Sequence, residues 1–272
     1  MKSIVEELWQ VRDTLTPDSL REPEIKKGIL DAIDDLDNGK IRVAYKEGKK
    51  WLVNDWVKKI ILIYTRVTKK YIMNDGTSKY FDKMPLKFDS WDQVKFESAN
   101  LRITVGAIVR KGAFISNSSI LKPSFVGIGV HIGSKTFIDA YSNIGACAQI
   151  GDNCHIGSHT AIAGSLEPIN SIPTIIEDNC HIGASSTIGN GVIIREGSII
   201  GSGVHIDSTT KIYDKETENI FYGEVPPYSV VISGVLPSAD GSVFTYAAII
   251  VNRTDEDSRA KLSVDRILKG TK

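Results

Sequence analysis

The 272-residue chain has no excess of charge of either sign, because 33 lysine and arginine residues balance 33 aspartate and glutamate residues. A strongly basic surface for nucleic acid or for a membrane is therefore not expected. No stretch approaches the roughly 18 apolar residues of a membrane-spanning helix. The first residues, MKSIVEELWQVRD, lack the apolar core of a secretion signal. These absences predict a cytoplasmic protein.

Cysteine is also scarce. The three cysteines are an odd number without regular spacing, which argues against a disulfide framework. Cys154 and Cys180 occupy a position of the repeat described next where a small buried side chain is expected, and a buried thiol there simply packs. Cys147 lies one residue short of that position. Catalysis by any of the three is the less favoured interpretation.

A six-residue period dominates the middle of the chain. In steps of six from residue 108, every position carries a large apolar side chain until the period breaks over residues 163–175, and it resumes at residue 176. The periodic residues are Ile108, Phe114, Ile120, Val126, Ile132, Ile138, Ile144, Ile150, Ile156, Ile162, Ile176, Ile182, Ile188, Ile194, Ile200, Ile206 and Ile212. Glycine often follows the periodic residue, and the fourth residue after it is mostly small.

This period fits neither an α-helix, which needs 3.6 residues, nor a half-buried strand, which needs two. Units with one deep aliphatic residue, one turn-forming glycine and one small residue wind into a three-sided prism of short parallel strands. Each strand pairs with the coils above and below it, and the periodic residues point inward. We therefore predict a mainly β fold, a parallel β-helix over residues 104–213 with an external loop at 163–175.

The flanking segments do not follow the period. Residues 1–103 predict a small α+β cap domain, and residues 214–272 predict C-terminal strands and a helix. The cap elements are expected at Ser3–Leu15, Glu22–Leu36 and Asp55–Val67 (helices) and at Ile41–Tyr45 and Lys50–Val53 (a hairpin). The C-terminal elements are expected at Ser229–Leu236 and Val243–Val251 (strands) and from about Asp255 (a helix).

Four histidines, His131, His155, His181 and His205, each directly precede a periodic residue. Residues on the same face are eighteen apart, so the gaps of 24 within the pairs 131/155 and 181/205 put the two members of each pair on neighbouring faces. No metal cluster within one chain is expected from them. Solvated, outward imidazoles are the favoured interpretation.

Three carboxylates follow a periodic isoleucine at a corner of the prism: Asp139, Glu177 and Asp207. A structural corner is the simplest interpretation, and Glu177 in IIEDN fits a solvated corner. Asp139 differs because an aromatic residue follows closely in FIDAYSNIG. The interruption at 163–175, which contains Glu167, must loop out of the prism wall. Such long excursions usually carry function or contact a neighbouring subunit.

Five stretches resemble the tetrahydrodipicolinate N-succinyltransferase family over nearly the whole chain: KYFDKMPLKF (79–88), LRITVGAIVRKGAFI (101–115), FIDAYSNIGACAQIG (137–151), GSLEPINSIPTIIEDNCHIGA (164–184) and STTKIYDKETENIFYGEVPPYSVVISGVLPS (208–238). The repeat alone is typical of acyltransferases in general, and the other stretches are more specific. The resemblance implies a left-handed coil, an N-terminal domain and succinyl transfer from succinyl-CoA in the lysine and diaminopimelate pathway.

The resemblance also implies roles for particular residues. Arg102 matches the family's substrate-binding arginine, whose guanidinium pairs with a carboxylate of the substrate. Asp139 matches the aspartate that meets the substrate's amine. Lys211 lies where the family's cofactor region begins and would hold a phosphate of CoA. The family further implies a homotrimer with CoA between subunits, and no metal or permanently bound cofactor.

One segment departs from the family. GASST (183–187) stands where the family commonly has GARSE, so Ser185 replaces an arginine and Thr187 replaces a glutamate often assigned as general base. A hydroxyl cannot accept a proton at neutral pH as a carboxylate can. Asp139 or, failing it, Glu167 is then the expected base. The alternatives are an acyltransferase with another acyl donor or amine acceptor, and a non-catalytic trimeric scaffold.

Overall fold

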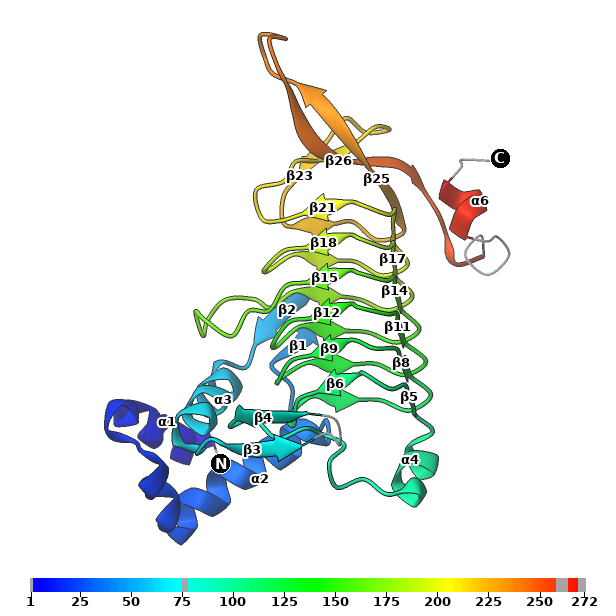
Figure 1. Cartoon of the computed structure of the whole chain (residues 1–272). Helices are drawn as coiled ribbons and strands as arrows, with labels where there is room; N and C mark the ends of the chain where they lie inside the picture. Colours follow the sequence, from blue (N-terminus) through cyan, green and yellow to red (C-terminus); the bar gives the residue numbers. More distant parts are fainter. Residues whose placement is uncertain (1, 75–77, 258–263, 269–272) are drawn as a thin grey trace.

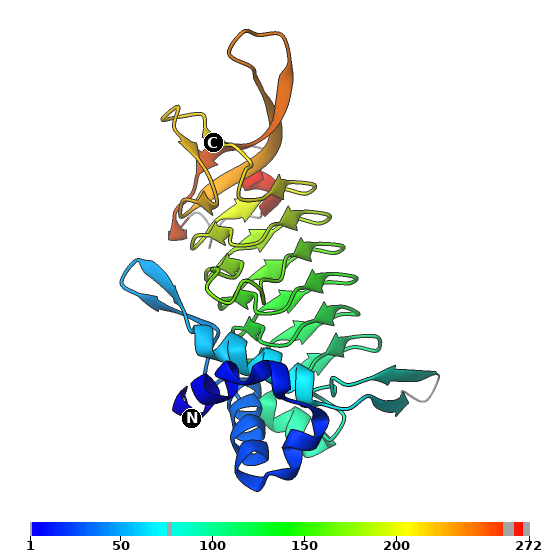
Figure 2. The ribbon, with the colours of Figure 1, turned by 90° about the vertical axis from the view of Figure 1, so that its left-hand side faces the viewer.

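The computed structural model describes residues 2–74, 78–257 and 264–268. Its N-terminal part contains three main helices and two hairpins, followed by a short helix. Their bounds are α1 (Lys2–Gln10), α2 (Pro23–Asp37), β1 (Ala44–Glu47), β2 (Lys50–Val53), α3 (Asp55–Val67), β3 (Tyr71–Asn74), β4 (Lys79–Asp82) and α4 (Gln93–Ala99), with 3₁₀ turns at Arg12–Thr14 and Pro17–Arg21. Figures 1 and 2 show these helices gathered at one end of the molecule.

The sequence predicts α3 at its observed bounds and α2 to within a residue. It predicts α1 too long, because Leu15 and Thr16 are extended before Pro17, whose ring disfavours helix in the preceding residue. The first strand of the hairpin lies closer to the turn than the sequence predicts. Glu47 pairs with Lys50 across a two-residue turn, so β1 begins at Ala44.

Residues 102 to 231 form a left-handed parallel β-helix with three faces. The first face contains β5 (Arg102–Ile103), β8 (Ile120–Leu121), β11 (Phe137–Ile138), β14 (His155–Ile156), β17 (His181–Ile182) and β20 (Ile199–Ile200). The second contains β6 (Ile108–Val109), β9 (Phe125–Val126), β12 (Asn143–Ile144), β15 (Ala161–Ile162), β18 (Thr187–Ile188) and β21 (His205–Ile206). The third contains β7 (Phe114–Ile115), β10 (His131–Ile132), β13 (Gln149–Ile150), β16 (Ile175–Ile176), β19 (Ile193–Ile194) and β24 (Glu224–Val225).

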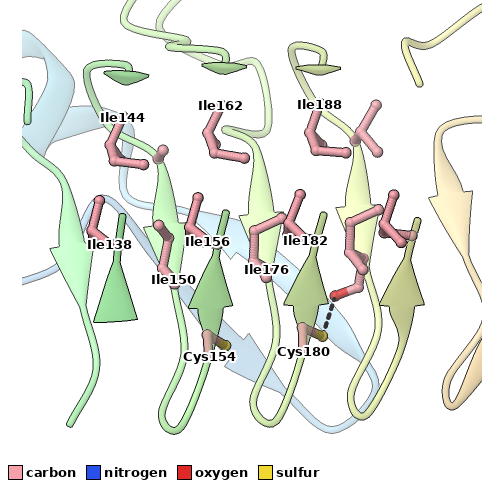
Figure 3. Close-up of a cluster of buried hydrophobic side chains, with 14 of the residues drawn as sticks. Ile138, Ile144, Ile150, Cys154, Ile156, Ile162, Ile176, Cys180, Ile182 and Ile188 are labelled. Atoms are coloured by element: carbon pink, nitrogen blue, oxygen red, sulfur yellow. Dashed lines mark hydrogen bonds between the residues drawn. The ribbon is translucent and has the colours of Figure 1, made fainter. Parts of the chain in front are cut away.

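From Val126 onward the periodic residues point inward, and all of them to Ile212 are at most 1% exposed. Figure 3 shows their stacked side chains. The predicted register is wrong for the first three positions. Ile108 is 46% exposed, and the inward residues of these strands are Val109, Ile115 and Leu121 instead. The cause is a corner one residue short, since only five positions separate Leu121 from Val126.

The small inward residues connect successive coils through hydrogen bonds. The hydroxyls of Thr136, Ser142 and Ser186 each donate to a glycine carbonyl of the next coil at 2.8–2.9 Å. The Cys154 thiol donates to the Glu177 carbonyl at 3.1 Å in the same way, and Cys180 lies beside it one coil on (Figure 3). A small polar group is therefore favoured inside because it satisfies a buried corner carbonyl.

Two excursions interrupt the coils, and both leave the edge between the second and third faces. Residues 163–174 connect β15 to β16, and residues 207–223 connect β21 to β24. The second excursion contains β22 (Ile212–Asp214) and β23 (Ile220–Phe221), which pair with each other. We name each edge by the two faces that it joins, so both excursions leave the prism at the second–third edge.

The C-terminal strands extend the first face. β25 (Ser229–Pro237) pairs in parallel with β20, and β26 (Phe244–Arg253) pairs with β25 and with β22. Parallel pairing thus continues beyond residue 213. The C-terminal helix expected from about Asp255 corresponds to α6 (Val264–Leu268). Residues 258–263 lie outside the described ranges. Ile267 of α6 packs on Ile199 and Val230. In the described chain, no helix is both long and apolar enough to cross a membrane.

Candidate active site and a buried interdomain clamp

The first face carries a column of outward side chains in its lower coils. Strand pairing aligns Arg102, Ile120, Phe137, His155 and His181 in this order. We call these five residues the first-face column. The rings of Phe137 and His155 lie 5.0 Å apart, and those of His155 and His181 lie 4.8 Å apart. Each step along the column is about 4.8 Å, the spacing of paired strands.

The two histidines of this column are closer than the sequence predicts. They are 26 residues apart, one coil of eighteen plus eight extra residues in the excursion, and so they stack in register. Burial lowers the pKa of His155, although the nearby Asp139 charge acts in the opposite direction. His131 on the third face is also not solvated. Burial and the charge of Arg42 lower its pKa to about 3, so its imidazole is neutral.

Asp139 lies beside this column, where the chain turns from the first face to the second. Its backbone N–H donates to the Ile156 carbonyl at 2.9 Å, which fixes the corner, and its Oδ1 accepts from the backbone N–H of Ala140 at 2.8 Å. Within the described ranges no lysine or arginine pairs with this carboxylate. Two residues on, Tyr141 is 69% exposed and its ring lies 5.2 Å from that of His159.

Arg102 is the lowest member of the column and is exposed to solvent. Its backbone N–H donates to Ser119, but in the part of the chain that is described its guanidinium has no carboxylate partner. Two ladder steps, about 10 Å, separate it from Phe137, the strand neighbour of Asp139. The fold therefore brings a guanidinium and a carboxylate, neither of them in an ion pair with another described residue, to the same side of the prism.

Glu167 and Lys211 lie elsewhere. Glu167 belongs to the excursion that leaves the second–third edge. Lys211 directly precedes β22, which pairs with β26 in the sheet that extends the first face, six ladder steps from β11. One copy of the chain therefore brings neither residue to Asp139. Glu167 lines a cavity of about 350 Å³ with Trp9 and Arg66 of the N-terminal part. Lys211 is half-buried next to β22, and its carbonyl accepts from the Ala248 N–H at 2.9 Å.

Thr187 lies on the second face, between Ala161 and His205 in the ladder. Its strand is two ladder steps from β12, the strand that follows Asp139, which is about 10 Å along the prism. Within one copy, a glutamate at this position would therefore not touch Asp139. Ser185, the other departure from the family, is a corner residue with φ of 59°.

Glu177 is not the solvated corner that the sequence predicts. It is only 6% exposed and binds Lys46 (2.9 Å), Arg195 (3.0 Å) and Trp51 Nε1 (2.8 Å). Arg195 also forms a bidentate pair with Glu224 at 2.8 and 3.0 Å. This cluster, which we call the Glu177 clamp, fastens the β1–β2 hairpin to the third face, next to a cavity of about 250 Å³.

The sequence contains a signal that another element covers part of the third face. At Ile175 and Ile193 the outward position is as apolar as the inward one, and both side chains are buried against Ala44 and Trp51 of the hairpin. Paired isoleucines in an otherwise alternating strand therefore mark the coils that another element covers. Neither the position of the partner hairpin nor the ion pairs of Glu177 can be read from that signal.

Comparison with known proteins agrees with this architecture. Residues 1–67 match the tetrahydrodipicolinate N-succinyltransferase N-terminal family, residues 129–164 match the bacterial transferase hexapeptide (six repeats), and residues 173–208 match the hexapeptide repeat of succinyl-transferase. A crystal structure of a Campylobacter jejuni protein named 2,3,4,5-tetrahydropyridine-2-carboxylate N-succinyltransferase shares the fold. Its TM-score is 0.50 at 16% identity, with 82% of this chain and 62% of that chain covered.

Curated relatives match nearly the whole chain. Proteins named 2,3,4,5-tetrahydropyridine-2,6-dicarboxylate N-succinyltransferase from Wolbachia sp. subsp. Brugia malayi and from Chromobacterium violaceum are each 46% identical, and the one from Dechloromonas aromatica is 43% identical. Each alignment covers 99% of this chain and 98% of the relative. Similarity of this extent, together with the matched N-terminal domain and hexapeptide repeats, shows that the chain belongs to the tetrahydrodipicolinate N-succinyltransferase family.

Proposed function

We propose that the chain transfers the succinyl group of succinyl-CoA to the amino group of ring-opened tetrahydrodipicolinate, in the cytoplasm, for lysine and diaminopimelate biosynthesis. The observation that carries this proposal is a pair of oppositely charged groups on one side of the prism, Asp139 and Arg102, neither of which forms an ion pair within the described residues. An amino dicarboxylate offers the complementary charges, an ammonium and a carboxylate. The family relationship supports the same reaction.

In the proposed reaction the cyclic imine first adds water and opens to 2-amino-6-oxopimelate. Asp139 accepts a proton from the ammonium group, and the freed amine attacks the thioester carbonyl of succinyl-CoA. Backbone N–H groups are suited to stabilise the oxyanion that forms. The new C–N bond remains, the C–S bond breaks, and CoA leaves as its thiol with a proton. Arg102 holds a carboxylate of the acceptor throughout.

Release of free CoA tests this function. The purified chain should release CoA from succinyl-CoA at a rate that depends on added tetrahydrodipicolinate. Release that depends on another amine, or only from another acyl-CoA, would support a changed specificity. No release with any acyl donor would support a non-catalytic scaffold. Either of these results would contradict the proposal.

The active site is proposed to form between copies of a homotrimer. Asp139 lies on the first–second edge, whereas Glu167 belongs to the excursion that leaves the second–third edge. Two edges of one prism cannot meet, but the edges of neighbouring prisms around a threefold axis can. Succinyl-CoA would then lie along the groove between two prisms, with Lys211 near a phosphate of CoA. Glu167 would serve as proton acceptor only if Asp139 does not.

Sedimentation analysis checks this assembly. We expect a single species of three times the 29.8 kDa chain mass that turns over at the concentrations of the assay. A stable monomer that retains full turnover would contradict the shared site, because all the necessary groups would then come from one prism.

Replacing Arg102 with lysine should raise the KM for the amino dicarboxylate roughly 10- to 100-fold, the effect of losing one charge-assisted hydrogen bond. An ammonium keeps the charge but loses the bidentate geometry of the guanidinium. The KM for succinyl-CoA should stay nearly constant. Steady-state kinetics with each substrate varied in turn measures both values, and equal losses for the two substrates would assign Arg102 a structural role.

A further inference from the structure

Lys58 of the N-terminal helix α3 forms hydrogen bonds to the excursion at residues 163–174. Lys58 is 0% exposed, and its Nζ donates to the Ser171 carbonyl at 2.7 Å, to Ser171 Oγ at 3.2 Å and to the Pro168 carbonyl at 3.4 Å. In the described part of the chain no carboxylate forms an ion pair with it. All three donor contacts of this buried ammonium therefore go to a single turn of the excursion.

This turn is ordered around Ser171. Its hydroxyl lies 2.6 Å from that of Ser165 and donates to the Pro168 carbonyl at 2.7 Å, to which the Ser171 N–H also donates. Ser165 is 3% exposed, and its N–H donates to the Ala146 carbonyl at the root of the excursion. The prism thus fixes both ends of the excursion, while Lys58 supplies the contacts to its middle.

A lysine in this place is costly for stability. A buried ammonium loses its hydration, and burial accordingly lowers the pKa of Lys58 and outweighs the opposing effect of Cys147. An apolar side chain of similar length would fill the same space without that cost. A buried lysine ordinarily pairs with a carboxylate, as the neighbouring Lys59 does with those of Glu6 and Asp55.

We propose that Lys58 is a positioning residue: it latches the excursion in the conformation that forms the acyl-CoA side of the active site. The excursion leaves the second–third edge of the prism, so a fixed turn there sets the position of Glu167 and the adjacent backbone at the groove where succinyl-CoA is proposed to lie. The catalytic consequence rests on the proposed function, whereas the latch itself does not. The N-terminal domain thereby acts on the reaction through the excursion.

Lys58→Met and Lys59→Met form a matched pair of variants on one helix. In the full-length protein without substrate, amide hydrogen exchange of residues 165–172 should accelerate in Lys58→Met and stay at the wild-type rate in Lys59→Met. The Tm of Lys58→Met should not fall, because a buried charge has been replaced by an apolar group. Unchanged exchange of the excursion in a folded Lys58→Met protein would overturn the latch, whether or not the chain turns over succinyl-CoA.

Kinetics then test the link to the reaction. A misplacement of about 1 Å can cost about a hundredfold in rate, so Lys58→Met should lower kcat/KM roughly 10- to 100-fold. Most of the loss should be a higher KM for succinyl-CoA, with the KM for the amine changed little. Lys58→Met could instead have a lower Tm and proportionally less active trimer, while the trimer that remains has normal KM values. That result would show a merely structural role and overturn the positioning proposal.

Discussion

Asp139→Asn should lower kcat about 10²- to 10⁴-fold, the usual contribution of a positioned general base, while the fold and the trimer persist. The amide cannot accept the ammonium proton, but it can still accept the backbone hydrogen bond from Ala140 that orders the corner. The resemblance implies a glutamate where this chain has Thr187, and we therefore propose Asp139 as the proton acceptor. Pre-steady-state or steady-state kinetics at neutral pH measures the effect.

Thr187→Glu is the companion variant. If Asp139 is the base, adding a carboxylate two ladder steps away in the same copy should change kcat little. A rate well above the wild type would instead mean that the missing glutamate limits this enzyme. An Asp139→Asn protein that works at full speed would refute the assignment and move it to Glu167.

Glu177→Ala should lower the free energy of unfolding by about 3–5 kcal/mol, the typical result of removing one partner from a buried ion pair. The change leaves Arg195, which is 14% exposed, without one of its two carboxylates, and it removes the acceptor of Trp51. Glu224→Ala is the matched control. It deletes the other partner of Arg195, but Glu224 is 45% exposed, so only about 0–1 kcal/mol is expected. Urea denaturation compares the two, and a loss of no more than about 1 kcal/mol for Glu177→Ala would show that the clamp contributes no more than a surface pair.

The Glu177 clamp also predicts that the folded state becomes less stable at acidic pH. Burial alone would raise the pKa of Glu177, but hydrogen bonds from Lys46, Trp51 and the Glu196 N–H outweigh it and hold the pKa below the ordinary 4.5. A carboxyl group with a depressed pKa stabilises the folded state fully above its unfolded pKa and loses that contribution as pH falls through the folded pKa. The clamp should therefore weaken below about pH 4.5, and Glu177→Gln should remove this part of the pH dependence.

The sequence predicts the prism well because its rule is short-range: every sixth residue must fill the same interior. The register error at its lower end has an equally local cause. Ile108-Val109, Phe114-Ile115 and Ile120-Leu121 are all pairs of apolar residues, so either member can satisfy the period. Only the five-residue step to Val126, at the Pro123 corner, decides between them, and a count in steps of six cannot detect it.

The residues of the candidate site and of the clamp likewise divide into those that local sequence indicates and those that depend on long-range packing. The roles proposed for Asp139 and Arg102 rest on motifs that stand close to them in the sequence. The stacking of His155 on His181 depends on how many residues of the excursion lie outside the wall. The contacts of Glu177 with its hairpin, and of Lys58 with the excursion, join residues more than a hundred positions apart. Such long-range packing leaves no periodic trace, except where paired isoleucines mark a covered face.

Mass spectrometry of the product tests the central claim most directly. The wild-type protein, given tetrahydrodipicolinate with equal amounts of succinyl-CoA and acetyl-CoA, should form the N-succinyl derivative of 2-amino-6-oxopimelate almost alone. Asp139→Asn should form the same product far more slowly. A predominantly acetylated product, or no acylated amine at all, would contradict the account.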